Sequence, residues 1–456
     1  MKNILTLCLV CLLFVGNTFA QNGQNIAFDL AKKNRKITLN GLKTSKTGAY
    51  GAGSFTTSEL AVALKNPEPF IAFSMSIDGT NLASDMIAIE LQTQTNGKWN
   101  AWETVDANHD FEQNARKFVT NMRELDKATT AIRVKITSKS AEMRLKSFKI
   151  RLFAAGNIST GDVNTATPEG LCVKPPATSR GAWGAGLGLT DNIFSGNPTF
   201  VNVTHLIVHH SATGNTSSNW AAVVASFFDT HVNTNGWADI GYNYLIAPDG
   251  TLFVGRGGGE NVQGAHFCGL NANTMGICMI GTYTTEAPTA ISVEKLKKML
   301  AWKASEKGID PTGRSPLANY PNSYSNISGH RDGCATSCPG DLIYAQLSTI
   351  QQNVKTEIAV CATATNDLFT EGSFRIAPNP NNGQFQISAV LKEKMDGLPL
   401  ILSVYGLDGK AIFEEKIDNL SLDFNQNIQL PNVAKGVYLV RLRSGDKAFS
   451  EKIQVF

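Results

Sequence analysis

An imidazole and a thiol stand eight positions apart in the segment 329–340, which reads Gly-His-Arg-Asp-Gly-Cys-Ala-Thr-Ser-Cys-Pro-Gly. The glycines and the proline predict a loop, in which the backbone can turn His330 and Cys338 back towards one point. A borderline ion such as zinc takes thiolate and imidazole ligands together. Two protein ligands hold such an ion poorly, so a third should lie elsewhere, and His209 is the best candidate.

The elements around these side chains must fix their direction. Residues 204–209 form a short apolar run that predicts a strand ending at His209. A strand end suits a metal ligand because the sheet fixes the side chain while the rim leaves room for a substrate. Helical spacing and further strands alternate along the chain, at 219–228, 241–246, 251–254, 275–280 and 293–305, with a turn at 248–250. The alternation predicts a mixed α/β layer.

The N-terminus predicts export. A basic start, an apolar run from Ile4 to Val15 and small residues before Ala20 are typical of a signal peptide cut after Ala20. The run is too short to span a bilayer, and no later stretch is apolar enough to be a transmembrane helix. We therefore expect a secreted or cell-surface protein with no integral membrane segment.

Length and composition bound the architecture. The chain has 456 residues, which predicts two to four domains. Its net charge of +3, with 17% charged residues, shows no basic excess and argues against a nucleic-acid partner. Of eight cysteines, Cys8 and Cys11 leave with the signal peptide. Disulfides are expected among the rest outside the cytoplasm.

The disulfide pairing stays open at this point. Cys268 with Cys278 could close a short loop, and Cys172 with Cys361 or Cys334 could tie a domain boundary to its core. Cys334 is also an alternative to Cys338 as a metal ligand.

The N-terminal third reads as short runs of period two between turn signals, which is an all-β sandwich or jelly-roll pattern. The runs lie at 70–77, 86–91, 131–136 and 148–152, with turn signals at 78–79 and 96–97. Trp99 and Trp102 either pack on the sheet, as aromatic residues commonly do, or form a platform for stacking a sugar.

Residues 175–360 resemble the family of peptidoglycan recognition proteins and type 2 N-acetylmuramoyl-L-alanine amidases. Six motifs in family order carry the resemblance: Ser179-Arg180 with Trp183-Gly184, 207–211, 236–243, Asp249-Gly250 with Gly255-Arg256, 264–266, and 329–332 with 336–340. In that family the zinc ligands align with His209, His330 and Cys338. Non-catalytic members commonly lack the cysteine, so the presence of Cys338 favours an enzyme. The family alignment and Pro339 favour Cys338 over Cys334 as the metal ligand.

The resemblance implies roles for further residues. It places Tyr242 near the attacked carbonyl, where its hydroxyl can donate to the developing charge while zinc-bound hydroxide attacks the amide. Thr336 stands where some relatives carry lysine, so we interpret it as a positioning residue. His266, Arg256 and Asn271 are predicted to contact the muropeptide, with capping of their loops as the alternative for Arg256 and Asn271. His210 should face away from the centre because it adjoins His209, and His231 should lie at a helix–loop junction.

The C-terminal eighty residues resemble the sorting domain of the type IX secretion system, on the basis of Ala377-Pro378-Asn379-Pro380 and Gly436-Val437-Tyr438. This implies a Gram-negative exporter, the secretion machinery as a partner and removal of the tail. An immunoglobulin-like binding module is the alternative. We expect a signal peptide (1–20), a β-sandwich accessory domain (21–155), a linker (156–171), an α/β zinc amidase domain with a mixed sheet flanked by helices (172–361), a linker (362–372) and a small β-sandwich sorting domain (373–456).

The resulting expectation is a Zn2+ amidase that cuts the lactyl-L-alanine amide bond of peptidoglycan. Its partners would be peptidoglycan or muropeptides. The alternatives are a non-catalytic peptidoglycan-binding protein and a zinc peptidase acting within the stem peptide.

Overall fold

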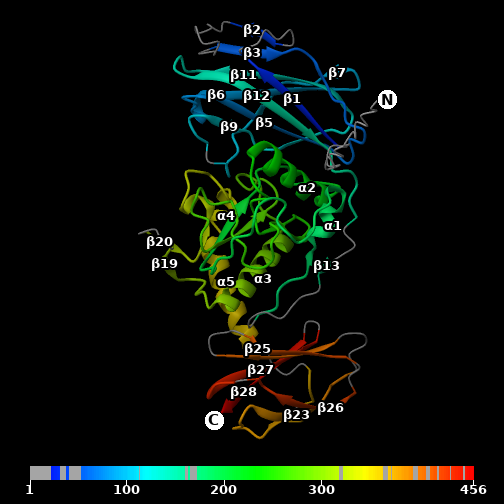
Figure 1. Ribbon diagram of the computed structural model, residues 1–456, viewed down its shortest axis with the longest axis vertical. Helices are drawn as coiled ribbons and strands as arrows, with labels where there is room; N and C mark the ends of the chain where they lie inside the picture. The colour runs from blue at the N-terminus through cyan, green and yellow to red at the C-terminus, as the bar shows by residue number, and fades with distance from the viewer. Residues whose placement is uncertain are drawn as a thin grey trace, which may run out of the picture.

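The computed structural model shows three regions that follow one another along the chain (Figure 1). An N-terminal β region packs on a central α/β region, and C-terminal sheets lie at the opposite end of the central region. The predicted signal peptide, residues 1–20, lies outside the described residues. The structure describes residues 22–30, 37–40, 53–111, 113–159, 163–164, 172–317, 322–362, 368–370, 372–393, 399–406, 411–418, 421–431, 433–444 and 447–456.

Two antiparallel sheets form the N-terminal region among the described residues. One sheet has the order β1-β12-β5-β10, with β9 also paired to β5, and the other has the order β2-β3-β11-β6-β7, with β4 on β11 and β8 on β6. Their inward side chains share one apolar core, because alternate residues of each strand point to the same face. The strands are β1 (Gly23–Asp29), β2 (Ile37–Asn40), β3 (Gly53–Thr57), β4 (Leu60–Ala61), β5 (Ile71–Thr80), β6 (Ile87–Thr95), β7 (Lys98–Trp99), β8 (Glu103–Val105), β9 (Lys117–Val119), β10 (Arg123–Leu125), β11 (Thr129–Ser138) and β12 (Arg144–Phe153), with the short 3-10 helix η1 (Ser84–Met86) between β5 and β6.

Of the two turn signals in this region, one is confirmed and one is wrong. Asn96 and Gly97 have φ of 51° and 73° and join β6 to β7, as an Asn-Gly hairpin turn requires. Asp78-Gly79, in contrast, continues β5, which pairs with β12 past this point. Gly79 is needed there for close packing, since a Cβ would lie 2.3 Å from the carbonyl oxygen of Arg144.

A mixed sheet forms the middle of the central region, as predicted. Its described strands follow the order β13-β14-β17-β16-β18-β15-β21, and β15 runs parallel to both of its neighbours. The strands are β13 (Val163–Asn164), β14 (Ala177–Thr178), β15 (His205–His210), β16 (Tyr244–Ile246), β17 (Leu252–Val254), β18 (Thr274–Met279) and β21 (Ile327–Gly329), and β19 (Arg314–Pro316) pairs with β20 (Ser323–Ser325) beside them. The strands and turn predicted around 204–280 are thus present, with ends shifted by up to three residues.

Helices cover both faces of this sheet. The predicted helices appear as α2 (Trp220–Thr230) and α3 (Ala290–Lys307), and the Asn219 and Thr289 side chains cap their first turns. Helix α3 shares the core on one face with α5 (Leu347–Ala362), and α2 lies on the other face. Shorter helical segments are α1 (Arg180–Gly184), η2 (Ala185–Leu187), η3 (His231–Asn235), η4 (His330–Asp332) and α4 (Asp341–Tyr344).

Helix α2 also packs against the N-terminal region. Ten of its residues, Ala221 to Thr230, are buried, because the mixed sheet covers one side of the helix and the β5–β12 sheet covers the other. Phe70, Ala72, Met122 and Phe153 of the N-terminal region belong to the same apolar cluster as α2. The helix is therefore buried on all sides rather than along one stripe.

Two disulfides are present among the described residues. Cys172 bonds to Cys361, which confirms one of the two pairings considered for Cys172. Cys268 bonds to Cys334, so the Cys268–Cys278 pairing is wrong. Cys278 lies inside β18, beside His209 of β15 and Leu245 of β16, and the sheet fixes it away from the loop that holds Cys268.

The C-terminal residues form two further antiparallel sheets around their own core. The strand orders are β22-β23-β26 and β25-β24-β27-β28. The strands are β22 (Arg375–Ala377), β23 (Gln384–Val390), β24 (Leu400–Tyr405), β25 (Ala411–Ile417), β26 (Asp423–Gln429), β27 (Gly436–Ser444) and β28 (Lys447–Val455).

Candidate metal centre

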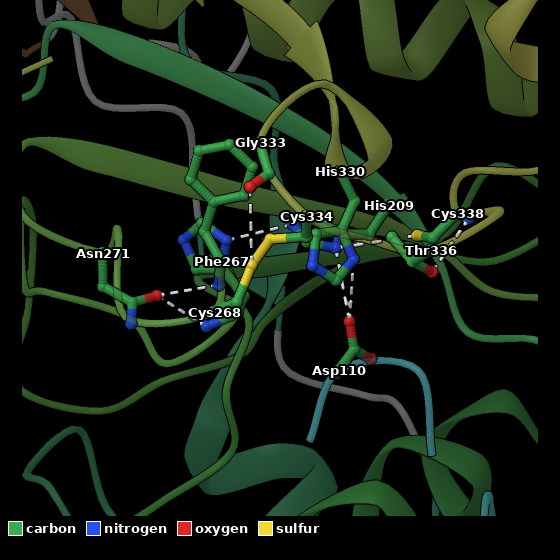
Figure 2. Close-up of a disulfide and its surroundings, with 11 residues drawn as sticks. Asp110, His209, Phe267, Cys268, Asn271, His330, Gly333, Cys334, Thr336 and Cys338 are labelled. Carbon is green, nitrogen blue, oxygen red and sulfur yellow. Dashed lines mark hydrogen bonds and ion pairs between the residues drawn. A yellow bond between two sulfur atoms is a disulfide. The ribbon is translucent and has the colours of Figure 1, made fainter. Parts of the chain in front are cut away.

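His209, His330 and Cys338 meet at one point, as the sequence predicted. His209 lies in β15, His330 begins η4, and Cys338 follows on the loop after η4. All three are buried, and the Cys338 sulfur lies 3.8 Å from His209 Nδ1. Together with Asp110 they offer ligand atoms that lie within 4.8 Å of one another. Figure 2 shows the imidazoles and the sulfur pointing towards the same space.

The loop 329–340 is shaped by its own side chains. The Asp332 carboxylate accepts from the Gly329 amide at 2.8 Å, which begins η4 at His330. The Cys338 carbonyl accepts from the Arg331 amide at 2.9 Å, and this contact closes the loop. The Thr336 hydroxyl accepts from the Cys338 amide at 3.2 Å, so Thr336 sets the direction of the cysteine. His330 and Cys338 are thereby brought together locally.

His266 supports His209 from behind. His209 Nε2 lies 3.0 Å from His266 Nδ1, and His266 Nε2 lies 3.3 Å from the Thr274 hydroxyl. If His209 Nε2 carries the proton and donates it to His266, the Nδ1 lone pair of His209 is free to bind a metal. His266 is 1% exposed, so its position fits the orientation of a ligand rather than contact with a substrate.

His210 follows His209 in the strand and so leaves it on the opposite face, but its ring still borders the centre, because its ligand nitrogen lies within 4.8 Å of the Cys338 sulfur. Its ring accepts from the Tyr283 amide at 3.3 Å, while its backbone amide donates to the Cys338 sulfur at 3.2 Å. The alternative ligand Cys334 is excluded because its sulfur is bonded to Cys268. Cys338 remains a free, buried thiol.

A fourth donor comes from the N-terminal region, where no sequence motif marks it. Asp110 Oδ1 lies 3.4 Å from His209 Nδ1 and 3.4 Å from His330 Nδ1. The Tyr242 hydroxyl donates to the other oxygen, Oδ2, of the same carboxylate. Figure 2 shows Asp110 on a blue loop that reaches the centre from the side opposite the 329–340 loop.

The electrostatics favour the protonation states that a metal requires in the imidazoles and the carboxylate, but not in the thiol. Burial lowers the pKa of His209 and of His330, so both imidazoles are neutral. Burial alone would raise the pKa of Asp110, but the surrounding histidines, His109 first, outweigh it and hold the pKa well below its usual range. Burial raises the pKa of the Cys338 thiol well above its usual range, so a cation is needed to hold it as a thiolate.

These residues fit a zinc ion. Among the described residues, His330 Nδ1 and Asp110 Oδ1 are buried without a hydrogen-bond partner, and a cation between them would satisfy both atoms. Light-atom ligands about 2.0–2.1 Å from a tetrahedral zinc lie about 3.3–3.4 Å apart. Both distances from Asp110 Oδ1 to the imidazoles match that separation. The thiolate and imidazoles are also the donors that zinc prefers.

The other predicted residues lie at different distances from the centre. Tyr242 is buried against it, and its ring centroid lies 5.4 Å from that of His209. Asn271 accepts from the His266 and Phe267 amides and so shapes the loop before β18. Arg256 donates to the Ile240 carbonyl at 3.1 Å.

Three further expectations can be compared with the structure. His231 directly follows α2 but begins the helical segment η3, so the helix continues past it and the expected helix–loop junction is wrong; its ring accepts from the Gly241 amide at 3.1 Å. Arg133 lies over the Trp99 ring at 3.9 Å, so this face of Trp99 packs on the sheet, while Trp102 is exposed.

The comparisons with known proteins agree with the site. Residues 199–341 match the family described as N-acetylmuramoyl-L-alanine amidase, and residues 375–455 match the secretion system C-terminal sorting domain. Peptidoglycan-recognition protein SC2 of Drosophila simulans is 33% identical over 150 residues, covering 32% of this chain and 73% of that protein. An N-acetylmuramoyl-L-alanine amidase of Sus scrofa is 32% identical over 142 residues, covering 30% of this chain and 22% of that protein.

Among solved structures, Drosophila PGRP-LB is 30% identical, and the match covers 38% of this chain and 91% of that chain with a TM-score of 0.30. The chain belongs to the family of peptidoglycan recognition proteins and type 2 amidases. Membership supports a role in cleaving or binding peptidoglycan, and the sorting domain implies secretion or display at the cell surface. The described residues contain no helix long and apolar enough to cross a membrane.

Proposed function

We propose that this chain is a zinc-dependent N-acetylmuramoyl-L-alanine amidase, which hydrolyses the amide between the lactyl group of N-acetylmuramic acid and L-alanine. The observation that carries the proposal is the convergence of His209, His330 and Cys338 beside the buried hydroxyl of Tyr242. Three protein ligands with one further position is the arrangement of catalytic zinc sites.

Each residue has a defined part in this mechanism. Zinc, when bound, supplies Lewis-acid polarisation and activates water at neutral pH. Tyr242 donates to the amide oxygen as negative charge develops there. Burial and the Asp110 carboxylate raise the pKa of Tyr242 well above its usual range, so its hydroxyl remains a donor. His266 keeps His209 in its binding orientation, and Thr336 positions Cys338.

The positions of Asn271 and Arg256 refine the role that we propose for them. Asn271 and Arg256 hold backbone on the loops beside the sheet, so we assign them to the shape of the substrate cleft. We propose that residues 21–155 form a β-sandwich accessory domain, that residues 172–361 form the amidase domain, and that residues 373–456 form a β-sandwich that directs export across the outer membrane of a Gram-negative bacterium and is then removed.

The assay is digestion of purified peptidoglycan with the full chain and zinc, followed by identification of the released ends. The Asp110 carboxylate lies within 4.8 Å of the metal-binding atoms of His209, His330 and Cys338. The Asp110→Ala variant is therefore assayed beside the native chain. New L-alanine amino termini with intact lactyl groups support the amidase, and Cys338→Ala should abolish them. Wall binding with no release from either chain would indicate a non-catalytic binding protein. Cuts within the stem peptide would indicate a zinc peptidase.

A further inference from the structure

The turn that carries Asp110 is fixed within the N-terminal region. The Asn108 side chain accepts from the amides of Asp110 and Phe111, at 2.9 and 3.1 Å. Gln113 donates to the carbonyls of Asn108 and Val119, at 3.0 and 2.9 Å. Such Asx-type contacts set the backbone of a turn locally. Asp110 is therefore presented in one direction by its own domain.

The same turn is seated on the central region by the residues beside Asp110. His109 Nε2 donates to the His210 carbonyl at 2.8 Å, one residue from the ligand His209. The Phe111 ring stacks on Trp237 with 6.4 Å between centroids and 18° between planes. Asp110 thus enters the centre between two anchors, and its side chain is 3% exposed.

A wider interface holds the two regions together. Arg151 makes a two-point contact with Asp229, with distances of 2.9 and 2.6 Å. Ser74 and Thr234 share a buried hydrogen bond of 2.7 Å, and Lys117 donates to the Asn235 carbonyl at 3.0 Å. With the apolar cluster around α2, these contacts make the insertion of Asp110 part of the fold rather than a chance approach.

The carboxylate of Asp110 occupies the place where substrate would react. One oxygen faces the two imidazole nitrogens, and the other accepts from the Tyr242 hydroxyl. In the proposed reaction the amide oxygen would face the same two groups, the metal and Tyr242. Asp110 therefore mimics the charged oxygen that develops during amide hydrolysis, and it does so from within the same chain.

We propose that Asp110 is the fourth ligand of the metal centre, supplied by the N-terminal domain, and that it closes the centre to muropeptide until that domain moves away. The closure rests on the substrate of the proposed function, muropeptide, and not on its cleavage, whereas the ligand assignment rests on neither. A four-ligand centre leaves no position for water or for a carbonyl. The full chain is accordingly latent, and displacement of the N-terminal domain exposes a three-ligand centre.

The ligand assignment is tested on the full chain loaded with Co2+ in place of zinc. Two variants are compared, Asp110→Ala and the isosteric Asp110→Asn, with Asp106→Ala as a control because Asp106 is an exposed carboxylate four residues away. The variants should keep the absorption band from the Cys338 thiolate and change the d–d bands, because one ligand has changed. A chelator should remove the metal at least about tenfold faster from them than from the native chain or the control.

The closure is tested with soluble muropeptide as the probe. Asp110→Ala and Asp110→Asn should bind and cleave it at least about tenfold better than the native chain or Asp106→Ala, a lower bound for uncovering an occupied ligand position. If the d–d bands and metal release match those of the native chain, Asp110 is not a ligand. If the native chain binds and cleaves muropeptide as well as the variants, the centre is not closed.

The two levels of the proposal can fail separately. If both Asp110 variants alter the metal spectrum and bind muropeptide better, yet neither cleaves peptidoglycan, the ligand and closure assignments hold and the amidase function fails. If the variants cleave the amide with an unchanged metal spectrum, the amidase function holds and the ligand assignment is overturned.

Discussion

The loop 329–340 and the turn 108–111 both deliver side chains to the metal centre, but different contacts hold them there. The loop is tied to the central region by the Cys268–Cys334 disulfide and by its own backbone hydrogen bonds. The turn reaches the centre only because the N-terminal sheets dock on α2. His330 and Cys338 are therefore held at the centre by a disulfide-linked loop of the central region. Asp110, the proposed fourth ligand, depends on a non-covalent interface and can be withdrawn.

The sharpest test of the zinc ligands on the loop 329–340 compares Cys338 with Cys334 of the same loop. Cys338→Ala should lower zinc affinity by more than about 100-fold, since loss of a direct ligand exceeds the loss of a supporting contact. Cys334→Ala should keep the zinc, because it removes only the disulfide to Cys268. Zinc content and a competition titration measure both. A full zinc content in Cys338→Ala would show that Cys338 is not a zinc ligand.

The Tyr242 hydroxyl donates to Asp110 in the structure and to the substrate amide oxygen in the proposed reaction, so Asp110 and substrate compete for it. In the Asp110→Ala background, Tyr242→Phe should lower the rate of amide hydrolysis by about 10²–10³-fold, because it removes one donor to the developing oxyanion, and should leave the zinc content unchanged. The rate of release of L-alanine amino termini is the measurement.

Tyr283→Phe is the matched control for Tyr242→Phe, since the Tyr283 hydroxyl is also buried but donates to the Ile280 carbonyl at 2.6 Å. Equal losses in the two variants would show that the effect is structural and not specific to Tyr242.

The withdrawal of Asp110 can be tested through the contacts that dock the N-terminal region on α2. Asp229→Asn removes the charge that faces Arg151, and the loss of a hydrogen-bonded charge pair should destabilise the docked state by about 1.5–3 kcal/mol. Denaturant unfolding should show the loss, and muropeptide cleavage should rise as Asp110 leaves more often.

The control for docking is Glu68→Gln, which breaks the more exposed pair with Lys127 and should cost about 0–1 kcal/mol. A loss of stability in Asp229→Asn without any gain in cleavage would mean that docking and closure are not coupled.

The contrast also explains what the sequence could predict. His209, His330 and Cys338 could be found because an apolar strand and a glycine-rich loop mark them locally. Asp110 carries no such mark, because its role arises from contacts with another region of the fold. Asn108-His109-Asp110 reads simply as a polar turn.

The errors have the same origin. Cys268 and Cys278 are close in sequence, but the register of β18 holds Cys278 in the sheet while the loop brings Cys334 to Cys268. Asp78-Gly79 has turn composition, yet pairing with β12 extends β5 through it. Long-range packing overrode a local signal in each case.

The smallest expected effect concerns pH at the docking interface. Glu124 of β10 faces the central region, where a Cβ at Gly214 would lie 3.9 Å from its Oε1. Burial raises the pKa of Glu124 from 4.5 to about 7, and the charge of Arg123 only partly opposes it. The folded state therefore binds a proton that the unfolded chain releases near pH 4.5, so its contribution is full below pH 4.5 and is lost as the pH rises through 7.

Glu124→Gln should remove this part of the pH dependence. The denaturation midpoint of the native chain should fall more between pH 5 and 8 than that of the variant, and the two should differ most at pH 8, where the native carboxylate is charged and buried. Comparing the two chains cancels the titration of the histidines, which they share. If the ionised carboxylate also weakens docking, cleavage of muropeptide by the native chain should rise with pH over the same window and stay flatter in the variant. Identical profiles would show that ionisation of Glu124 does not weaken docking, and the withdrawal of the fourth ligand would then depend on the other contacts of the interface.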